Sequence, residues 1–275
     1  MDKLLEIDLH KILDERMPKR VSRVVPGFMI SALERLIHQD ELNGMLRSAY
    51  PSRGSEFATK ILRYLEVDVE VKGLENLDGH RRLMFASNHP LGGLDGIALI
   101  SVLGKRYGDD GVRFLVNDML MNVEPLSGMF LPVNKYGSQG RTSAKAINAA
   151  LASEMHILQF PAGLVSRLHA DGEIRDLDWQ KSFVSKAIEY ERDIVPVRFE
   201  GLNTRRFYRT AYWRKKLGLK VNIEQALLPG EVCRSRGKRF RIIFGKPVGW
   251  ETLRERGESP VMLAEAIKRM SYSLK

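Results

Sequence analysis

Residues 81–107 read RRLMFASNHPLGGLDGIALISVLGKRY, and they place a strand pattern, a glycine turn and a helix pattern in direct succession. The run RRLMFASN has the length and apolar content of a buried strand, and DGIALISVLGKRY has the apolar spacing of a helix. Asn88 and His89 stand at the exit of the predicted strand, and Asp95 follows after two glycines. The stretch therefore predicts a strand–turn–helix unit with polar side chains at its turn.

The same alternation continues along the chain and sets the fold class. Further runs of strand length are VDVEVKG (67–73), VRFLVN (112–117), GMFLPVN (128–134), EMHILQFP (154–161), DIVPVRFE (193–200), KVNIEQALL (220–228) and FRIIFGKPV (240–248). Helix patterns are RTSAKAINAALAS (141–153), WQKSFVSKAIEYER (179–192) and the segment from Pro260 onward. Alternating strands and helices predict an α/β fold, with a largely parallel central sheet flanked by helices.

The first part of the chain has a different pattern. Residues 1–66 read as a helical N-terminal extension, and residues 67–275 read as one domain that includes the C-terminal helix. Within the extension, RMPKRVSRVVPGFMI (16–30) runs from basic residues into apolar ones. This pattern suits docking on an anionic membrane surface, and it equally suits a helix pair that packs on the main domain.

Charge and cysteine content narrow the class of protein. The chain of 275 residues carries 44 Lys and Arg against 34 Asp and Glu, a net charge of +10, so we expect an anionic partner. Cys233 is the one cysteine, which excludes an intramolecular disulfide and favours a reducing compartment. The sequence has no signal-peptide pattern and no run near the roughly 20 apolar residues of a membrane span. We therefore expect a cytoplasmic protein.

His89 and Asp95 have the residue types of a general base and the carboxylate that orients it. A carboxylate can hold the proton of one ring nitrogen, which leaves the other nitrogen free to take a proton from a hydroxyl. The glycines between them let the turn fold tightly enough for the two side chains to meet. Asp95 can alternatively stabilise the start of the following helix, with His89 as a turn residue. The residues FPAGLVSR (160–167) continue another predicted strand, so both turns should lie at the same edge of the sheet.

The sequence lacks the motifs that would supply an enzyme nucleophile or a metal. No G-x-S-x-G elbow is present, GSQGRT (137–142) lacks the lysine of a phosphate-binding loop, and no spacing of His, Cys and carboxylates indicates zinc. We expect His156 and His169 to be structural or solvent-exposed. A His–Asp pair without an enzyme nucleophile fits direct attack by a substrate's own hydroxyl or amine on an activated acyl group.

Four ordered blocks give a resemblance to a known family. They are NHPLGGLDG, GMFLPVNKYGSQGR, FPAGLVSR and DIVPVRF. In this order and at these separations they resemble the blocks of the lysophospholipid (glycerolipid) acyltransferase superfamily. Two departures from the family pattern are visible. Five residues, rather than four, separate His89 from Asp95, and Ala162 stands where the family usually has Glu.

The form NHPLGGLDG resembles a bacterial branch linked to aminolipids and to hemolysin-like proteins. The resemblance implies an O-acyltransferase of lipid biosynthesis that moves a fatty acyl group from a thioester to the hydroxyl of a lyso-aminolipid, without an acyl-enzyme. It implies no cofactor beyond the donor thioester, which is carried on acyl carrier protein or coenzyme A. It also implies a cytoplasmic enzyme that is peripheral on the inner face of the cell membrane, with the anionic membrane surface as partner.

By the same resemblance His89 is the general base and Asp95 orients it. The substrate-binding residues that it implies are Asn88, Gly163, Ser166, Arg167, Lys135 and Arg141. For Lys135 and Arg141, ordinary solvated surface charge is the simpler interpretation. Because Ala162 removes a carboxylate near Arg167, we expect the site to favour an acceptor with an accessible anion.

Three alternatives stay open. The chain can be a 1-acylglycerol-3-phosphate acyltransferase of phospholipid synthesis. It can also be a family member that has lost activity and serves as a membrane scaffold. A non-catalytic basic protein that binds membranes or nucleic acid is the third; the basic runs RSRGKRFR (234–241) and RTAYWRKKLG (209–218) favour it, but no nucleic-acid-binding motif accompanies them, and we expect no nucleic acid partner.

Overall fold

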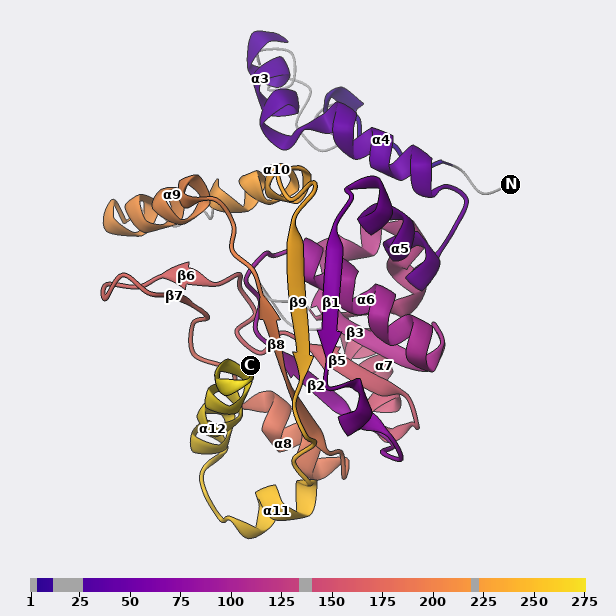
Figure 1. The fold of residues 1–275 in the computed structure, drawn as a ribbon, viewed down its shortest axis with the longest axis vertical. Helices are drawn as coiled ribbons and strands as arrows, with labels where there is room; N and C mark the ends of the chain where they lie inside the picture. Colours follow the sequence, from indigo (N-terminus) through magenta and orange to yellow (C-terminus); the bar gives the residue numbers. More distant parts are fainter. Residues whose placement is uncertain (1–3, 12–26, 134–139, 219–222) are drawn as a thin grey trace.

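The chain folds around one seven-stranded sheet, here described from a computed structural model that places residues 4–11, 27–133, 140–218 and 223–275 (Figure 1). The sheet order is β1-β9-β8-β2-β5-β3-β4. Neighbouring strands run parallel except β8 and β9, which are antiparallel. The strands are β1 (Asp68–Lys72), β2 (Met84–Ser87), β3 (Val112–Asn117), β4 (Phe130–Val133), β5 (His156–Gln159), β8 (Ile194–Glu200) and β9 (Arg239–Phe244). The predicted α/β class with a largely parallel sheet is confirmed.

Helices and short 3₁₀ turns cover the sheet. The helices are α3 (Gly27–Ile37), α4 (Gln39–Ala49), α5 (Gly54–Tyr64), α6 (Leu94–Tyr107), α7 (Arg141–Ala152), α8 (Ser182–Glu189), α9 (Arg205–Lys216), α10 (Leu228–Cys233), α11 (Trp250–Glu255) and α12 (Pro260–Ser273). The 3₁₀ turns are η1 (Leu74–Leu77), η2 (Asp118–Asn122), η3 (Glu124–Met129) and η4 (Ile223–Leu227). A small hairpin of β6 (Arg167–Leu168) and β7 (Ile174–Arg175) projects from the side of the sheet (Figure 1).

The central strand β2 shows why its sequence is apolar throughout. All four of its residues are buried, because helices cover both faces of the sheet. Phe85 packs into the core that α4, α5 and α6 complete, whereas Met84 and Ala86 pack into the core formed with α7, α8, α11 and α12. Strand side chains alternate between faces, so each face of β2 needs its own apolar residues.

In the described part of residues 1–66, the helices α3, α4 and α5 precede the first strand, and α4 and α5 join this part to the main core. Met45 and Ala49 of α4 enter the main core. His38 separates α3 from α4 with a left-handed backbone (φ 57°). Phe28, Met29 and Leu33 of α3 remain exposed, so they do not form the buried stripe of an ordinary packed helix pair. Most of the basic stretch 16–30 lies outside the described residues.

One prediction about local structure is wrong, and one helix was not predicted. The segment 220–228 is not a strand: its described part forms η4 and the first residue of α10, whose first turn contains Pro229. Glu224 in this segment is fully buried beside Arg167 and Arg214, and Pro229 suits the first turn of a helix. The helix α9 was not predicted, since its basic residues obscure an inward face of Phe207, Tyr208 and Ala211. In the described part of the chain, no helix is long and apolar enough to span a bilayer.

Candidate active site

The candidate site begins where β2 ends, at the carboxyl edge of the parallel strands. Asn88 is buried and links this turn to β8, because its Nδ2 donates to the Phe199 carbonyl at 2.9 Å and its Oδ1 accepts from the Phe199 N–H at 2.6 Å. The amide side chain therefore replaces a strand pairing at the point where β2 leaves the sheet. Both polar atoms of the Asn88 side chain are engaged in this contact, while its predicted part in substrate binding stays a prediction.

His89 and Asp95 meet across the glycine turn. The Nδ1 of His89 lies 3.0 Å from Oδ2 of Asp95. The same oxygen accepts from the N–H groups of Leu91 at 2.9 Å and Gly92 at 3.2 Å, and Oδ1 accepts from the N–H of Gly96 at 2.9 Å. Asp95 therefore holds the backbone of the turn and orients the imidazole at the same time, and the two alternatives drawn from the sequence coexist.

The environment of Asp95 keeps it ionised. Burial alone would raise the pKa of this carboxyl, but the charge of His89 and the hydrogen bonds from His89, Leu91 and Gly92 outweigh burial and lower the pKa below its ordinary value. A carboxylate accepts hydrogen bonds only, so Nδ1 of His89 carries the proton and Nε2 is the basic nitrogen. Within the described residues, no hydrogen bond occupies Nε2.

The imidazole is held by packing as well as by Asp95. The ring of Phe160 stacks on it with a centroid distance of 4.0 Å and an interplanar angle of 25°. The side chain of His89 is 16% exposed, so it is not sealed inside the protein. A ring fixed on one face and open at one nitrogen is suited to act as a general base.

Gly92 is required for this turn. Its φ of 80° lies in the left-handed region, and a Cβ there would stand 2.5 Å from Cγ2 of Val165 and 2.9 Å from Cδ2 of Leu228. Both the backbone conformation and the close approach of neighbours exclude a side chain. The extra residue relative to the family spacing is accommodated in this turn.

The second predicted turn does lie beside the first. The N–H of Ser166 donates to the His89 carbonyl at 2.8 Å. Ser166 itself is buried, and its hydroxyl donates to Asp176 at 2.6 Å. Gly163 turns the loop with a φ of 62°, and Ala162 is buried at its start. Next to the turn, residues Ala162, Leu164, His169, Leu177, Asp178 and Gln180 line an open hollow of about 540 Å³.

Asp176 is a buried carboxylate that sequence reasoning missed. Its Oδ1 accepts from the hydroxyl of Ser166 and from the N–H of His89 at 3.2 Å, and its Oδ2 accepts from Nε1 of Trp179 at 2.9 Å. Burial raises the pKa of this carboxyl above its ordinary value. In the sequence it stands in a polar run, EIRDLDW, that gives no signal for such a place. Asp176 therefore links the turn that holds His89 to the turn that holds Ser166.

Arg167 is paired rather than free. Its Nη2 donates to Oε1 of Glu224 at 2.9 Å, and Nε of Arg214 lies 2.8 Å from Oε2 of the same carboxylate. Glu224 is fully buried, and Arg167 is 11% exposed. Ala162 supplies no carboxylate to Arg167, and Glu224 supplies one from a distant part of the chain, while the expected preference for an anionic acceptor stays a prediction. Arg167, Arg214 and Glu224 together carry one net positive charge, and this cluster is called the Arg167 rim.

Among the described residues, no hydrogen bond or ion pair joins the remaining candidates to His89 or Asp95, and one candidate lies outside the described residues. Lys135 falls in the segment 134–139, which the structure does not describe. Arg141 is exposed at the start of α7. His156 accepts from the Leu83 N–H at 3.2 Å and stacks on Tyr107, so it is structural as expected. His169 closes the β6–β7 hairpin through the Arg175 carbonyl.

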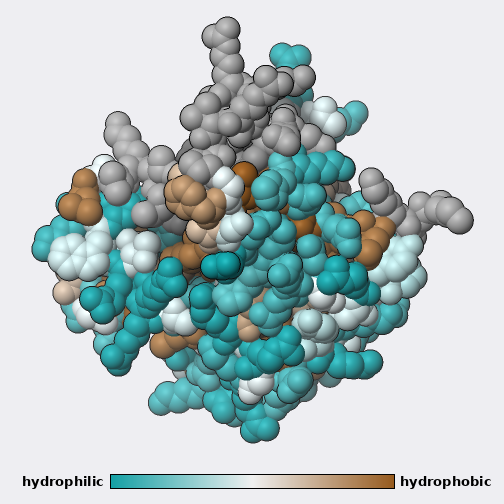
Figure 2. Space-filling model, turned by 90° about the horizontal axis from the view of Figure 1, so that it is seen from above, coloured by the Kyte–Doolittle hydropathy of each residue, from teal (hydrophilic) through white to brown (hydrophobic). Residues whose placement is uncertain are grey.

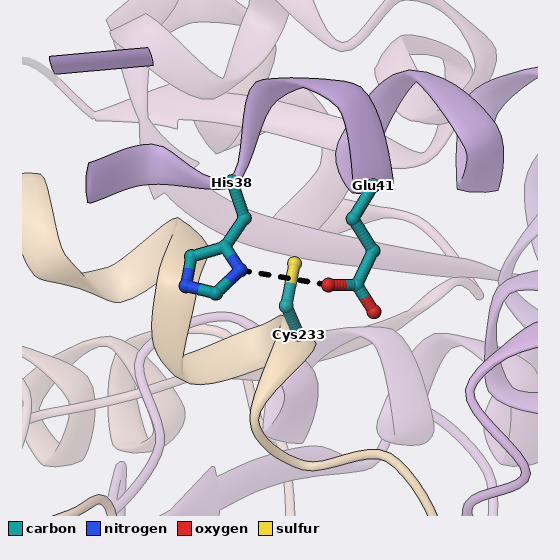
Figure 3. A group of neighbouring side chains, drawn as sticks. All are labelled: His38, Glu41 and Cys233. Carbon is teal, nitrogen blue, oxygen red and sulfur yellow. Dashed lines mark ion pairs between the residues drawn. The ribbon is translucent and has the colours of Figure 1, made fainter. Parts of the chain in front are cut away.

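Among the described residues, one group has metal-ligand chemistry, and it joins α4 to α10 (Figure 3). Nδ1 of His38 lies 3.5 Å from Oε2 of Glu41, with Cys233 beside them and all three ligand atoms within 4.8 Å of one another. Burial and the neighbouring Glu41 raise the pKa of the Cys233 thiol to about 12. Arg236 already pairs with Glu41 at 3.1 Å. The thiol is protonated and the carboxylate is already paired with an arginine. The group is therefore a set of non-covalent contacts that joins α4 to α10.

Comparison with known proteins gives two kinds of match. A model of the acyltransferase family matches residues 11–275. A lyso-glycine lipid O-acyltransferase from Phocaeicola vulgatus is 44% identical over 273 residues, which cover 99% of this chain and 96% of that protein. A lyso-glycine lipid O-acyltransferase from Bacteroides thetaiotaomicron is 42% identical over 273 residues, covering 99% of each chain.

Among solved structures, the 1-acyl-sn-glycerophosphate acyltransferase PlsC from Thermotoga maritima is similar over 89% of this chain and 91% of its own, with a TM-score of 0.42 and 16% identity. That likeness is too remote to bear on the site.

Proposed function

Because this chain belongs to the acyltransferase family and is an acyltransferase, we propose that it transfers a fatty acyl group from a thioester to the free hydroxyl of a lyso-glycine lipid. The acceptor is an N-acyl amino acid whose acyl chain bears the hydroxyl. Two relatives of that activity, similar over nearly the whole chain, support this acceptor class. The observation that carries the chemistry is the pairing of His89 with Asp95, which leaves Nε2 as an unengaged base.

The mechanism is a single addition and elimination. Nε2 of His89 takes the proton of the acceptor hydroxyl as its oxygen attacks the thioester carbonyl. Asp95 stabilises the imidazolium that forms, because its lowered pKa keeps it negatively charged. The tetrahedral intermediate collapses, the carbon–sulfur bond breaks, and the imidazolium returns the proton to the departing thiolate. No acyl group is attached to the enzyme.

The net positive charge around Arg167 provides a place for the acceptor's carboxylate. Gly163 and Arg167 lie on the loop that bonds to the His89 carbonyl through Ser166, so a headgroup held there is next to the base. Arginine binds both carboxylates and phosphates. The choice between these two anions therefore depends on the shape of the site as well as on Arg167. Arg167→Ala should therefore raise the acceptor KM more than it lowers kcat.

We propose further that the donor is a thioester of acyl carrier protein or coenzyme A and that the enzyme works as a peripheral protein at the inner face of the cell membrane. Both donors are acidic, and the chain carries a net charge of +10. Residues 1–66 are proposed as a unit that assists docking, and the exposed Phe28 and Met29 of α3 support this.

A competition experiment tests the acceptor. Purified protein receives a hydroxyl-bearing N-acyl glycine and lysophosphatidic acid at equal concentration, with acyl carrier protein and coenzyme A thioesters in separate reactions, and mass spectrometry identifies the products. The proposal expects the acylated glycine lipid to dominate. A clear preference for lysophosphatidic acid would assign the protein to phospholipid synthesis and leave His89 and Asp95 in their roles.

A further inference from the structure

The helix α9 has an inner face that belongs to the active site. Tyr208 lies beneath the catalytic turn, where its hydroxyl donates to the Pro90 carbonyl at 3.4 Å and accepts from the N–H of Asn203 at 3.1 Å. The ring of Phe207 lies under the guanidinium of Arg167, 5.6 Å from its centroid. Arg214 reaches the buried Glu224, which binds Arg167. The position of α9 is thus fixed by the groups that shape the site.

The outer face of α9 is exposed. Arg206, Arg209, Trp213 and Lys216 follow one another at helical spacing and are all exposed. The helix contains six basic residues and no acidic one. Within the described part of the chain, no carboxylate pairs with its five outward cations, which are Arg205, Arg206, Arg209, Lys215 and Lys216. A row of cations without counter-ions is suited to a large anionic partner.

Apolar groups accompany these cations and narrow the kind of partner. Trp213 is 49% exposed, Tyr212 is 40% exposed, and Leu217 after the helix is 70% exposed. Lys216 lies over the Trp213 ring, with its Nζ 4.9 Å from the centroid. Tryptophan and tyrosine favour the boundary between lipid headgroups and acyl chains, and basic residues there bind anionic lipids. An aromatic and leucine edge beside cations fits a membrane surface better than it fits a nucleic acid, which has no apolar layer to receive Leu217.

The surface next to α9 also exposes apolar side chains. The helix α3, with its exposed Phe28, Met29 and Leu33, contacts η4, which α9 also contacts. Figure 2 looks onto this end of the molecule and shows hydrophobic surface set among hydrophilic surface there. In Figure 1, α3, α9 and α10 occupy one end of the molecule.

We propose that the outer face of α9 is a docking surface for an anionic lipid bilayer, with Trp213 and Leu217 in the interfacial layer and Arg206, Arg209 and Lys216 on lipid headgroups. This inference rests on the proposed function in one respect, since a lipid acceptor must reach the site from a membrane. The same helix packs against the acceptor loop on its inner side, so docking places the Arg167 rim and His89 near the bilayer surface.

The first test is vesicle binding by charge-reversal variants. One variant combines R206E, R209E and K216E, and the matched control combines K105E, K181E and R269E, which are exposed cations on other elements. Each basic residue near an anionic surface contributes about fivefold in binding, so the α9 variant should lose at least about tenfold in affinity for phosphatidylglycerol-containing vesicles. The control variant should lose much less, and high salt should remove the difference. Unfolding curves verify that both variants are folded.

The second test follows Trp213 itself. Its fluorescence should shift to shorter wavelength when vesicles are added and should be quenched by brominated acyl chains. Trp213→Phe should abolish both signals, whereas Trp250→Phe should preserve them, because Trp179 is buried and Trp250 packs against Arg254.

The proposal would be overturned if the α9 variant bound vesicles as well as the wild type does. It would also be overturned if the α9 variant lost binding to duplex DNA but kept its binding to vesicles. Acyl transfer to a detergent-dispersed acceptor separates this proposal from the proposed function. The α9 variant should retain that activity, while absence of transfer by the wild-type enzyme would remove the proposed function and leave the vesicle result standing.

Discussion

Asp95 Oδ2 accepts hydrogen bonds from Nδ1 of His89 and from two backbone N–H groups of the turn between them, at 2.9–3.2 Å. One carboxylate oxygen thus couples the conformation of the turn to the orientation of the base. The glycine turn serves to bring these groups together, and its sequence is explained by that arrangement.

Asp95→Asn should lower kcat by about 10³-fold. An amide cannot replace both carboxylate oxygens, since in either orientation its NH₂ group faces a donor: Gly96 N–H in one, and His89 with Leu91 and Gly92 in the other. In the second orientation the imidazole also loses its fixed tautomer, and in both the side chain no longer carries the negative charge that stabilises the imidazolium. Steady-state kinetics and circular dichroism measure the effect, with the exposed Asp78→Asn as control. Turnover within about tenfold of wild type in a folded protein would contradict the assigned role.

Gly92→Ala and Gly79→Ala form a matched pair, because both glycines have positive φ, 80° and 76°, but nothing lies within 4 Å of a Cβ at Gly79. Gly79→Ala should cost about 1 kcal/mol from backbone strain alone. Gly92→Ala should cost about 1–3 kcal/mol more, because its Cβ displaces Val165, and it should reduce kcat by moving the N–H that holds Asp95. Urea unfolding gives the two free energies. Equal costs would mean that the turn adapts without strain.

Glu224→Gln tests the buried ion pairs beside the acceptor loop. Removal of this carboxylate leaves Arg167 and Arg214 without their counter-ion in a buried place, and we expect a loss of about 3 kcal/mol in the free energy of unfolding. Glu200→Gln is the control, because Glu200 also lies between two arginines, Arg198 and Arg241, but is 31% exposed. It should cost under about 1 kcal/mol. Similar losses for both variants would contradict the importance of burial.

The α/β class and most of the strands could be predicted because buried parallel strands read as short apolar runs, as MFAS and IVPV do. The His89–Asp95 pair could be predicted because both residues belong to one turn. Glu224 and Asp176 could not, since each meets its partner only after distant segments fold together. The same holds for α9, because its buried Tyr208 contacts the turn after β2 and its buried Phe207 packs beside Arg167, both distant in the sequence.

Acid should destabilise the protein through His156. Burial, with the charges of Arg192 and Arg106, lowers the pKa of this imidazole from 6.5 to about 4. Between these values the unfolded chain binds a proton that the folded chain does not. Stability from this group is therefore complete above pH 6.5 and is lost as the pH falls toward about 4, by on the order of 3 kcal/mol.

Urea unfolding across this pH range checks the effect. His156→Asn keeps an acceptor for the Leu83 N–H and should flatten the pH dependence, while replacement of the more exposed His80 by Asn should not. An unchanged slope in His156→Asn would assign the acid sensitivity to other groups.

The central claim is that His89 activates the acceptor hydroxyl, and product analysis of His89→Ala tests it most directly. Wild-type enzyme, a fatty acyl thioester and a hydroxyl-bearing N-acyl glycine should yield a product heavier by one acyl group in mass spectrometry. His89→Ala, with an unfolding curve close to that of wild type, should form this product at least about 10³-fold more slowly. A folded His89→Ala protein that forms it at a near-normal rate would contradict the account.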